Sequence, residues 1–276
     1  MRTHSLDPID VRKTILAMLH KGKASHLGSS MSVVEMLIAV YRSMDVDSIY
    51  TKKQERSRVI VSKGHAAAAL YAVMAHFGLI DFKLLETYCQ DDSYLAGHVS
   101  HAVEFVEHST GALGHGLSVA CGCALGLRAR GFDNSYVFSI LGDGELHEGS
   151  IWESVMFAKH HDLSHLITLV DDNKISSITR TAEVIDMRPL RDRFAGFGLR
   201  VYEVNGNDSA AVLGAIDQVR NGSDVSVIIC STVKGYGVPF AENSPIWHYR
   251  SLGDRDYQVA IEYLAHLQGK PASVVF

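Results

Sequence analysis

Residues 136–145 read YVFSILGDGE, and residues 166–175 read LITLVDDNKI. Each stretch is a short apolar run that ends in glycine, acidic or amide residues, which predicts buried β-strands over 136–141 and 166–170. A helix is predicted between them, over residues 149–160. Strands that alternate with helices form parallel sheets, in which helices cover both faces.

The same alternation continues on both sides of this unit. Apolar residues from Ile9 to Leu19 recur at helical spacing, and an irregular stretch is expected over 173–181. Further helices are predicted over 32–44, 66–77, 114–130, 190–195 and 209–220, and further strands over 59–61, 199–204 and 225–231. We therefore predict an α/β fold with a mainly parallel sheet and helices on both faces, in one domain over residues 1–276.

The composition is that of an ordinary globular protein. Of 276 residues, 47% are apolar and 21% are charged, and the net charge of −5 gives no support for nucleic-acid binding. The stretch from Ala66 to Ile80 is shorter than the ~20 residues of a membrane span, and no signal-like stretch follows Met1. The cysteines suit neither a disulfide scaffold nor a zinc ribbon: Cys89, Cys121, Cys123 and Cys230. We expect free thiols, a cytoplasmic location and no contact with a membrane.

Gly142-Asp143-Gly144-Glu145 follows the first of the two quoted strands. The glycines permit a tight turn, and a loop that leads into a helix can present amide N–H groups to a phosphate. Asp143 would then supply an oxygen to a metal that bridges the phosphate. Taken alone, the pattern equally fits a strand-to-helix turn that Asp143 caps.

Asp171-Asp172-Asn173-Lys174-Ile175 ends the second strand. Adjacent parallel strands would bring Asn173 beside Asp143. A carboxylate, an amide oxygen, a nearby backbone carbonyl and two phosphate oxygens would suit magnesium or calcium. The chain has no Walker-A pattern and no GxGxxG, which makes nucleotide triphosphates and dinucleotides less attractive ligands.

Gly142-Asp143-Gly144, followed after 28 residues by Asn173, resembles the metal–diphosphate motif of thiamine-diphosphate enzymes. The longer string over 142–153, GDGELHEGSIWE, is similar to transketolases in particular. The resemblance implies a thiamine-diphosphate-binding fold, with Mg²⁺, or Ca²⁺ or Mn²⁺, held by Asp143, Asn173 and the Ile175 carbonyl. It also implies that Gly142, Gly144 and Glu145 contact the cofactor.

Other segments match the same family in the same order along the chain. They are His26 with Gly28 and Ser29, SKGH at 62–65, Gly97-His98, STGALG at 109–114, TVKGYGV at 232–238, and Trp247-His248. The resemblance implies that His65, Gly111, Leu113 and His248 contact the cofactor. It gives catalytic roles to His26, His98 and His248, which would hydrogen-bond the sugar and move protons.

Singly, each of the 15 histidines is more often a surface or core residue than a functional one. A zinc cluster is an alternative for some of them, although no HExxH or CxxC pattern is present. The chain also departs from transketolases at Ala112, His115 and Tyr249-Arg250, and over 176–180. These changes spare the metal ligands but alter the acceptor end of the pocket, where Arg180 or Arg250 could bind an anionic group.

The family's reaction transfers a two-carbon ketol unit from a ketose to an aldose, so sugars or sugar phosphates are the expected substrates. In transketolases, a glutamate on the following pyrimidine-binding domain activates the cofactor. We expect a separate C-terminal transketolase subunit to supply that glutamate, in an α2β2 assembly. Alternatives are a 2-oxoacid dehydrogenase or deoxyxylulose-phosphate synthase subunit, a non-catalytic cofactor-binding module, or a piece of a longer enzyme.

Overall fold

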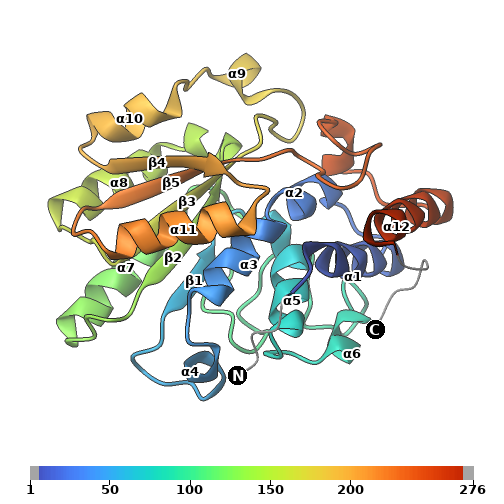
Figure 1. Cartoon of the computed structure of the whole chain (residues 1–276), viewed down its shortest axis with the longest axis horizontal. Coiled ribbons are helices and arrows are strands. Elements are labelled where there is room, and N and C mark those ends of the chain that lie inside the picture. The colour runs from blue at the N-terminus through green and yellow to red at the C-terminus, as the bar shows by residue number, and fades with distance from the viewer. Residues whose placement is uncertain (1–5, 270–276) are drawn as a thin grey trace.

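The computed structural model describes residues 6–269, and a five-stranded parallel sheet forms their centre (Figure 1). The strand order is β1-β2-β3-β5-β4. The strands are β1 (Arg58–Val61), β2 (Val137–Gly142), β3 (Leu166–Asp172), β4 (Arg200–Asn205) and β5 (Ser226–Ser231). Gly142 pairs with Asp171, and Asp172 pairs with Ser231, so β2, β3 and β5 end level at one edge.

Helices cover both faces of the sheet (Figure 1), as predicted. Along β3, Ile167 and Leu169 pack against the side that carries α3, α5 and α11, while Leu166 and Val170 pack toward α7, α8 and α10. Both faces of the central strands are therefore buried. This explains why their sequences are continuous apolar runs with no polar alternation.

The helices of the described residues have the following bounds. On the side of α3 lie α1 (Pro8–Lys21), α2 (Leu27–Ser32), α3 (Val34–Arg42), α5 (Ala67–His76), α11 (Ser209–Arg220) and α12 (Asp254–Gln268). The other face carries α7 (Gly116–Ala129), α8 (Gly149–His160) and α10 (Leu190–Gly196). Shorter elements are α4 (Val46–Tyr50), α6 (Phe82–Leu85), α9 (Thr181–Val184) and the 3₁₀ turns η1 (Gly64–Ala66), η2 (Gly144–His147) and η3 (Pro245–His248).

The helix predicted over 32–44 is wrong in its extent, because α2 and α3 are separated at Val33. The Ser32 hydroxyl lies 3.2 Å from the Ser29 carbonyl and donates to Asp171 Oδ2 at 2.6 Å. A serine hydroxyl that bonds backbone and distant groups competes with regular helix, which accounts for the break. The break places α2 directly above the end of β3.

Helix α12 was not predicted, although Tyr257, Ala260, Ile261 and Leu264 have helical spacing. It packs on α1 and buries Ala260, Ile261 and Leu264. No helix within residues 6–269 is long and apolar enough to cross a membrane, and all four cysteines are free thiols. The single-domain prediction includes residues 1–5 and 270–276, which lie outside the described residues, and it stays a prediction.

Candidate active site

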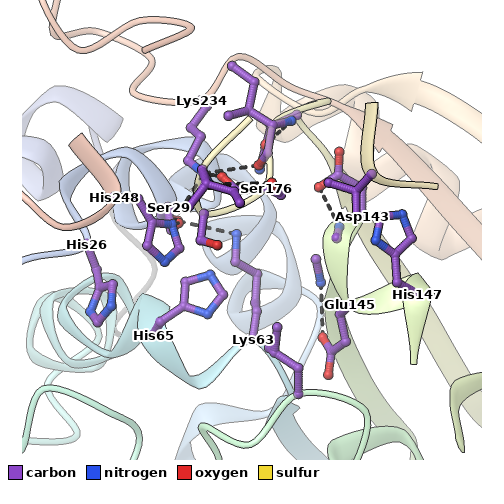
Figure 2. A pocket seen from close by; sticks show the side chains of 18 of the residues that line it. His26, Ser29, Lys63, His65, Asp143, Glu145, His147, Ser176, Lys234 and His248 are labelled. Carbon is purple, nitrogen blue, oxygen red and sulfur yellow. Dashed lines mark hydrogen bonds between the residues drawn. The ribbon is translucent and has the colours of Figure 1, made fainter. Parts of the chain in front are cut away.

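A cavity of about 470 Å³ lies at the edge where β2 and β3 end. Figure 2 shows His26, His65 and His248 on one side of it, Asp143, Glu145 and His147 on the other, and Lys63 and Lys234 between them. Every site residue predicted from the sequence lines this cavity: His26, His65, His98, Gly111, Leu113, Gly142, Asp143, Gly144, Glu145, Asn173, Ile175 and His248. The fold thus brings together segments from nearly the whole length of the chain.

Asp143 and Asn173 meet because β2 and β3 are neighbours in the sheet. The backbone N–H of Asp143 donates to the Asp171 carbonyl at 3.1 Å. In return, the Asp143 carboxylate accepts from Lys174 N at 2.5 Å and from Gly144 N at 2.8 Å. Asn173 Oδ1 accepts from Ile175 N at 3.1 Å. These bonds hold the two loops together and confirm the predicted juxtaposition.

Carboxylates are crowded at this edge. Burial, with added repulsion from Asp171 and Asp172, raises the pKa of Asp143 to about 7. Arg188 offsets part of this charge: its Nη atoms lie 2.8 and 3.2 Å from the oxygens of Asp172 and 4.0 Å from Asp143. A further cation beside Asp143 would stabilise the ionised carboxylate.

Asp171 is fully buried and connects four segments of the site. It accepts hydrogen bonds from Lys63 and Thr232, from the Ser32 hydroxyl at 2.6 Å and from Asn173 Nδ2 at 3.2 Å. Burial alone would raise the pKa of Asp171, but the Lys63 ammonium and these hydrogen bonds lower it. Asp171 therefore remains an anion that orients the amide of Asn173.

Two buried lysines give the cavity its positive charge. Lys63 and Lys234 are each only 1% exposed, and both line the cavity. Lys234 Nζ donates to the carbonyls of Ile175 at 3.0 Å and Ser176 at 2.5 Å, and it lies 3.3 Å from His248 Nδ1. Burial, and secondly repulsion by Lys63, lowers the pKa of Lys234 to about 8. Such a site favours an anionic ligand, which would relieve the repulsion.

Four histidines form one cluster in this cavity. The His26 ring centroid lies 5.2 Å from those of His98 and His248 and 5.6 Å from that of His65. Burial is the main cause that lowers the pKa of His26 to about 4 and of His248 to about 3, and it holds the pKa of His65 well below its ordinary value. These three imidazoles are neutral near pH 7 and can accept or donate hydrogen bonds to hydroxyl groups.

Glu145 lines the cavity, but its carboxylate is engaged by the protein. It accepts from the Ser62 hydroxyl, from Gly114 N at 2.8 Å and from Gly142 N at 3.2 Å. Burial raises the pKa of Glu145. The side chain thus joins the end of β1 to the loop before α7, and its predicted contact with the cofactor stays a prediction.

Two glycines are required by close approach between segments. A Cβ at Gly64 would lie 2.4 Å from the carbonyl carbon of Thr110, so no larger residue fits between Lys63 and His65 without a backbone shift. Gly111 has φ +154°, and a Cβ there would lie 3.0 Å from His98 Cδ2. Both glycines keep the loop at 109–114 against the histidine cluster.

The positions at which the chain departs from transketolases lie mainly outside this cavity. His115 is exposed at the start of α7 and contacts the carbonyls of Ala112 and Leu113. Arg180 forms a β-bridge with Ile175, and Arg250 stacks on Trp247 with its Cζ 4.9 Å from the ring centroid. Neither arginine lines the cavity, whereas Tyr249 does.

The side chains of Lys63, Lys234, Ser29, Asp171 and Arg188 contribute to the site but were not assigned roles from the sequence. Four of them stand within the motifs, and a lysine that is fixed between glycine-rich turns was a usable signal. Arg188 stands 16 residues beyond Asp172 in a segment with no distinctive pattern. Within residues 6–269, no group of three or more His, Cys, Asp or Glu side chains is arranged to hold a metal ion.

The donor set fits a divalent metal bound together with a diphosphate. One buried carboxylate, one amide oxygen and one backbone carbonyl lie together, which are the oxygen ligands that Mg²⁺ and Ca²⁺ take. These are too few ligands for a closed protein cage, so ligand oxygens must complete the coordination. The buried ammonium groups of Lys63 and Lys234 suit the negative charge of a diphosphate.

Comparison with known proteins agrees with this geometry. Residues 9–270 match the family described as "Transketolase, thiamine diphosphate binding domain". One of the two subunits of an apulose-4-phosphate transketolase from Actinobacillus succinogenes is 35% identical, over 92% of this chain and 92% of that protein. A 6-deoxy-6-sulfo-D-fructose transketolase subunit from a Clostridium species is 34% identical, over 92% of this chain and 93% of that protein.

A transketolase from Pichia stipitis, solved with fructose 6-phosphate, superposes with a TM-score of 0.85 and 27% identity. That likeness covers 96% of this chain but only 40% of the longer transketolase chain. The family resemblance inferred from the motifs is therefore confirmed, and the chain belongs to the transketolase family as a thiamine-diphosphate-binding-domain subunit.

Proposed function

We propose that this chain is the diphosphate-binding subunit of a two-subunit transketolase. With thiamine diphosphate and a divalent metal, the assembled enzyme would transfer a two-carbon ketol unit from a ketose to an aldose. The observation that carries this proposal is one cavity in which Asp143, Asn173 and Ile175 face Lys234 and a cluster of neutral histidines. The match to named transketolase subunits over nearly the whole chain supports it.

In this proposal, Asp143, Asn173 and the Ile175 carbonyl hold the metal, with Mg²⁺ preferred over Ca²⁺ or Mn²⁺. Lys234 now donates to the Ile175 carbonyl, and its ammonium is free to turn toward an anionic ligand because it is held by carbonyls and not by a carboxylate. Asp171 stays paired with Lys63 and keeps Asn173 oriented. Bound thiamine diphosphate supplies the carbanion chemistry of the reaction.

The histidines act on the sugar. His26 and His98 lie edge to face, so each presents ring nitrogens to hydroxyl groups of a substrate in the cavity. His248 is positioned by contacts of its Nδ1 with Lys234 at 3.3 Å and with the Ser29 hydroxyl at 3.5 Å. The backbone also joins two of them, because His26 N donates to the His248 carbonyl at 2.9 Å. Neutral imidazoles in this arrangement can take up and return protons as bonds to the sugar change.

A partner chain is supported by the rim of the cavity. Ile178, Val184 and Tyr249 line it and are 72%, 48% and 64% exposed. Large apolar side chains at the mouth of a site indicate a surface that another protein covers. We propose that the partner is a C-terminal transketolase subunit, that its pyrimidine-binding domain supplies the activating glutamate, and that the assembly is α2β2.

The experiment is calorimetric titration with thiamine diphosphate and Mg²⁺, without and with a co-expressed chain that carries a pyrimidine-binding domain. We expect tight binding and ketol transfer only in the mixture. Asp143→Asn should lower the metal-dependent affinity at least about tenfold, because it removes the anionic metal ligand. Asp133→Asn, in an exposed loop, is the matched control.

Two results would contradict the proposal. Folded protein that binds no thiamine diphosphate in either sample would remove the cofactor assignment. Turnover of pyruvate in place of a ketose by the mixture would indicate a different thiamine-diphosphate enzyme.

A further inference from the structure

The active-site cavity continues into two further cavities that lead to the surface. A middle cavity of about 380 Å³ shares His26, His98 and Tyr249 with the active-site cavity. An outer cavity of about 590 Å³ shares Lys23 and Ser251 with the middle one. A path therefore runs from the histidine cluster past Lys23 to solvent.

Charge is distributed unevenly along this path. Among the described residues that line the middle cavity, Lys23 is the only lysine, arginine, aspartate or glutamate. The Lys23 ammonium has no hydrogen bond or ion pair to any residue within 6–269. An unopposed cation at the end of a neutral passage attracts a negatively charged group.

The other cations at the outer cavity have acidic partners. Lys21 Nζ lies 2.8 Å from Glu86, His20 Nε2 lies 2.8 Å from Asp254, and Arg250 Nη2 lies 3.7 Å from Asp256. These pairs leave Lys23 as the available positive charge where the middle cavity opens into the outer one.

The backbone fixes the position of Lys23. Gly22 and Lys23 end α1 in a turn in which Lys23 has φ +47°, Lys23 N donates to the His20 carbonyl and Ala24 N donates to the Leu19 carbonyl. A Cβ at Gly22 would lie 2.4 Å from the Tyr88 carbonyl oxygen, so this turn is packed tightly against the segment at 88–89. Three peptide units separate Lys23 from His26, so their Cα atoms lie within about 11 Å of each other. That distance is comparable to the length of an extended sugar.

We propose that Lys23 binds the anionic terminus of the sugar substrate, so that this subunit itself selects ketoses and aldoses that carry a phosphate or sulfonate group at the end remote from the carbonyl. The inference rests on the proposed ketol-transfer function. With the reacting carbonyl end of the sugar at the histidine cluster, the chain of hydroxyls lies along the middle cavity and its charged end reaches Lys23. Phosphate and sulfonate are both tetrahedral oxyanions that an ammonium group binds.

The test compares three ketoses with the same carbon chain: D-fructose, fructose 6-phosphate and 6-deoxy-6-sulfo-D-fructose. With the reconstituted two-subunit holoenzyme, Lys23→Gln should lower kcat/KM for the anionic ketose that the wild type prefers by about tenfold or more. The value for D-fructose should change by less than about twofold. Lys23→Arg should keep the preference, and Lys21→Gln, whose ammonium is already paired with Glu86, is the matched control. Preference for the phosphate over the sulfonate, or the reverse, identifies which anion the site accepts.

Calorimetric binding of the same ketoses to the complex provides a readout that does not need turnover. If the complex binds the cofactor but transfers no ketol unit, the proposed function fails, while the binding preference still decides the role of Lys23. The inference is overturned if Lys23→Gln lowers kcat/KM equally for charged and neutral ketoses. It is also overturned if the wild type shows no preference for an anionic ketose, or if the preference survives in Lys23→Gln.

Discussion

Arg12 and Glu35 join α1 to α3 inside the helical layer, whereas Lys63 and Asp171 meet where β1 and β3 end at the cavity. Both pairs are buried. In the first, the Nη atoms of Arg12 lie 2.7 and 2.8 Å from the two oxygens of Glu35. The remaining Arg12 donors reach the carbonyls of Met31 at 3.3 Å and Tyr236 at 2.9 Å. All of this charge is used within the protein, and it fastens the segment that carries Lys234 to the helices.

The Lys63–Asp171 pair differs because Lys63 lines the active-site cavity. Asp171 divides its two oxygens among Lys63, Ser32, Thr232 and Asn173. The positive charge of Lys63 therefore has one protein partner on one side and the ligand space on the other. The difference between the pairs teaches that burial alone does not mark a functional charge. A functional charge is one whose partners leave a side open to the ligand.

Breaking the enclosed pair should have the largest effect on stability. Glu35→Leu leaves the Arg12 guanidinium buried without its carboxylate, and it cannot deprotonate, so the free energy of unfolding should fall by about 3–5 kcal/mol. Urea denaturation measures this change. The double variant Arg12→Met/Glu35→Leu should recover most of the loss, since apolar side chains can replace a buried pair. A loss below about 1 kcal/mol for Glu35→Leu would contradict this account.

Breaking the open pair should cost less stability but more function. In Asp171→Asn, Lys63 can be solvated through the cavity, so the free energy of unfolding should fall by about 1–3 kcal/mol. Because Asn173 loses the acceptor that orients its amide, the affinity for thiamine diphosphate with Mg²⁺ should fall about 10–100-fold. Calorimetry on folded samples measures this affinity. Glu35→Leu is the matched control, and an equal loss of affinity in both variants would abolish the distinction between the pairs.

The sequence predicts most of the fold because its signals are local. Apolar runs that end in Gly142-Asp143-Gly144 and Asp171-Asp172-Asn173 predict both central strands and their meeting at one edge. The break at Val33 could not be predicted, because it depends on Ser32 reaching Asp171, 139 residues away in the chain. Helix α12 had a readable pattern at Tyr257, Ala260 and Ile261 that was not used.

The site residues were predictable as positions, but their partners were not. Each of His26, His65, His98 and His248 stands in a short motif, yet only the fold shows that their rings cluster around His26. Lys63 and Lys234 stand within motifs but received no role, because a lysine in sequence is usually a solvated surface residue. The two contacts of Lys234, with Ile175 and with His248, come from different loops, so no local pattern encodes them.

The smallest effect that we predict is the acid sensitivity of the histidine cluster, which lies on the open side of the comparison. An unfolded histidine has a pKa of about 6.5, whereas burial lowers the pKa of His26 to about 4 and of His248 to about 3 in the folded protein. As the pH falls through this window, the unfolded chain takes up protons that the folded chain refuses. The free energy of unfolding of the protein without cofactor must therefore decrease on acidification from about pH 6.5 to about pH 4.

His26→Gln removes one of these groups, so the decrease over the same pH range should be shallower, as measured by urea denaturation at stepped pH. His160→Gln, at an exposed position on α8, is the matched control for loss of a histidine. An unchanged pH dependence in His26→Gln would show that the buried imidazole is already protonated or solvated in the folded state. In that case the cluster would present cations to the substrate in place of neutral proton acceptors, and the roles of the histidines and the two lysines would have to be reassigned.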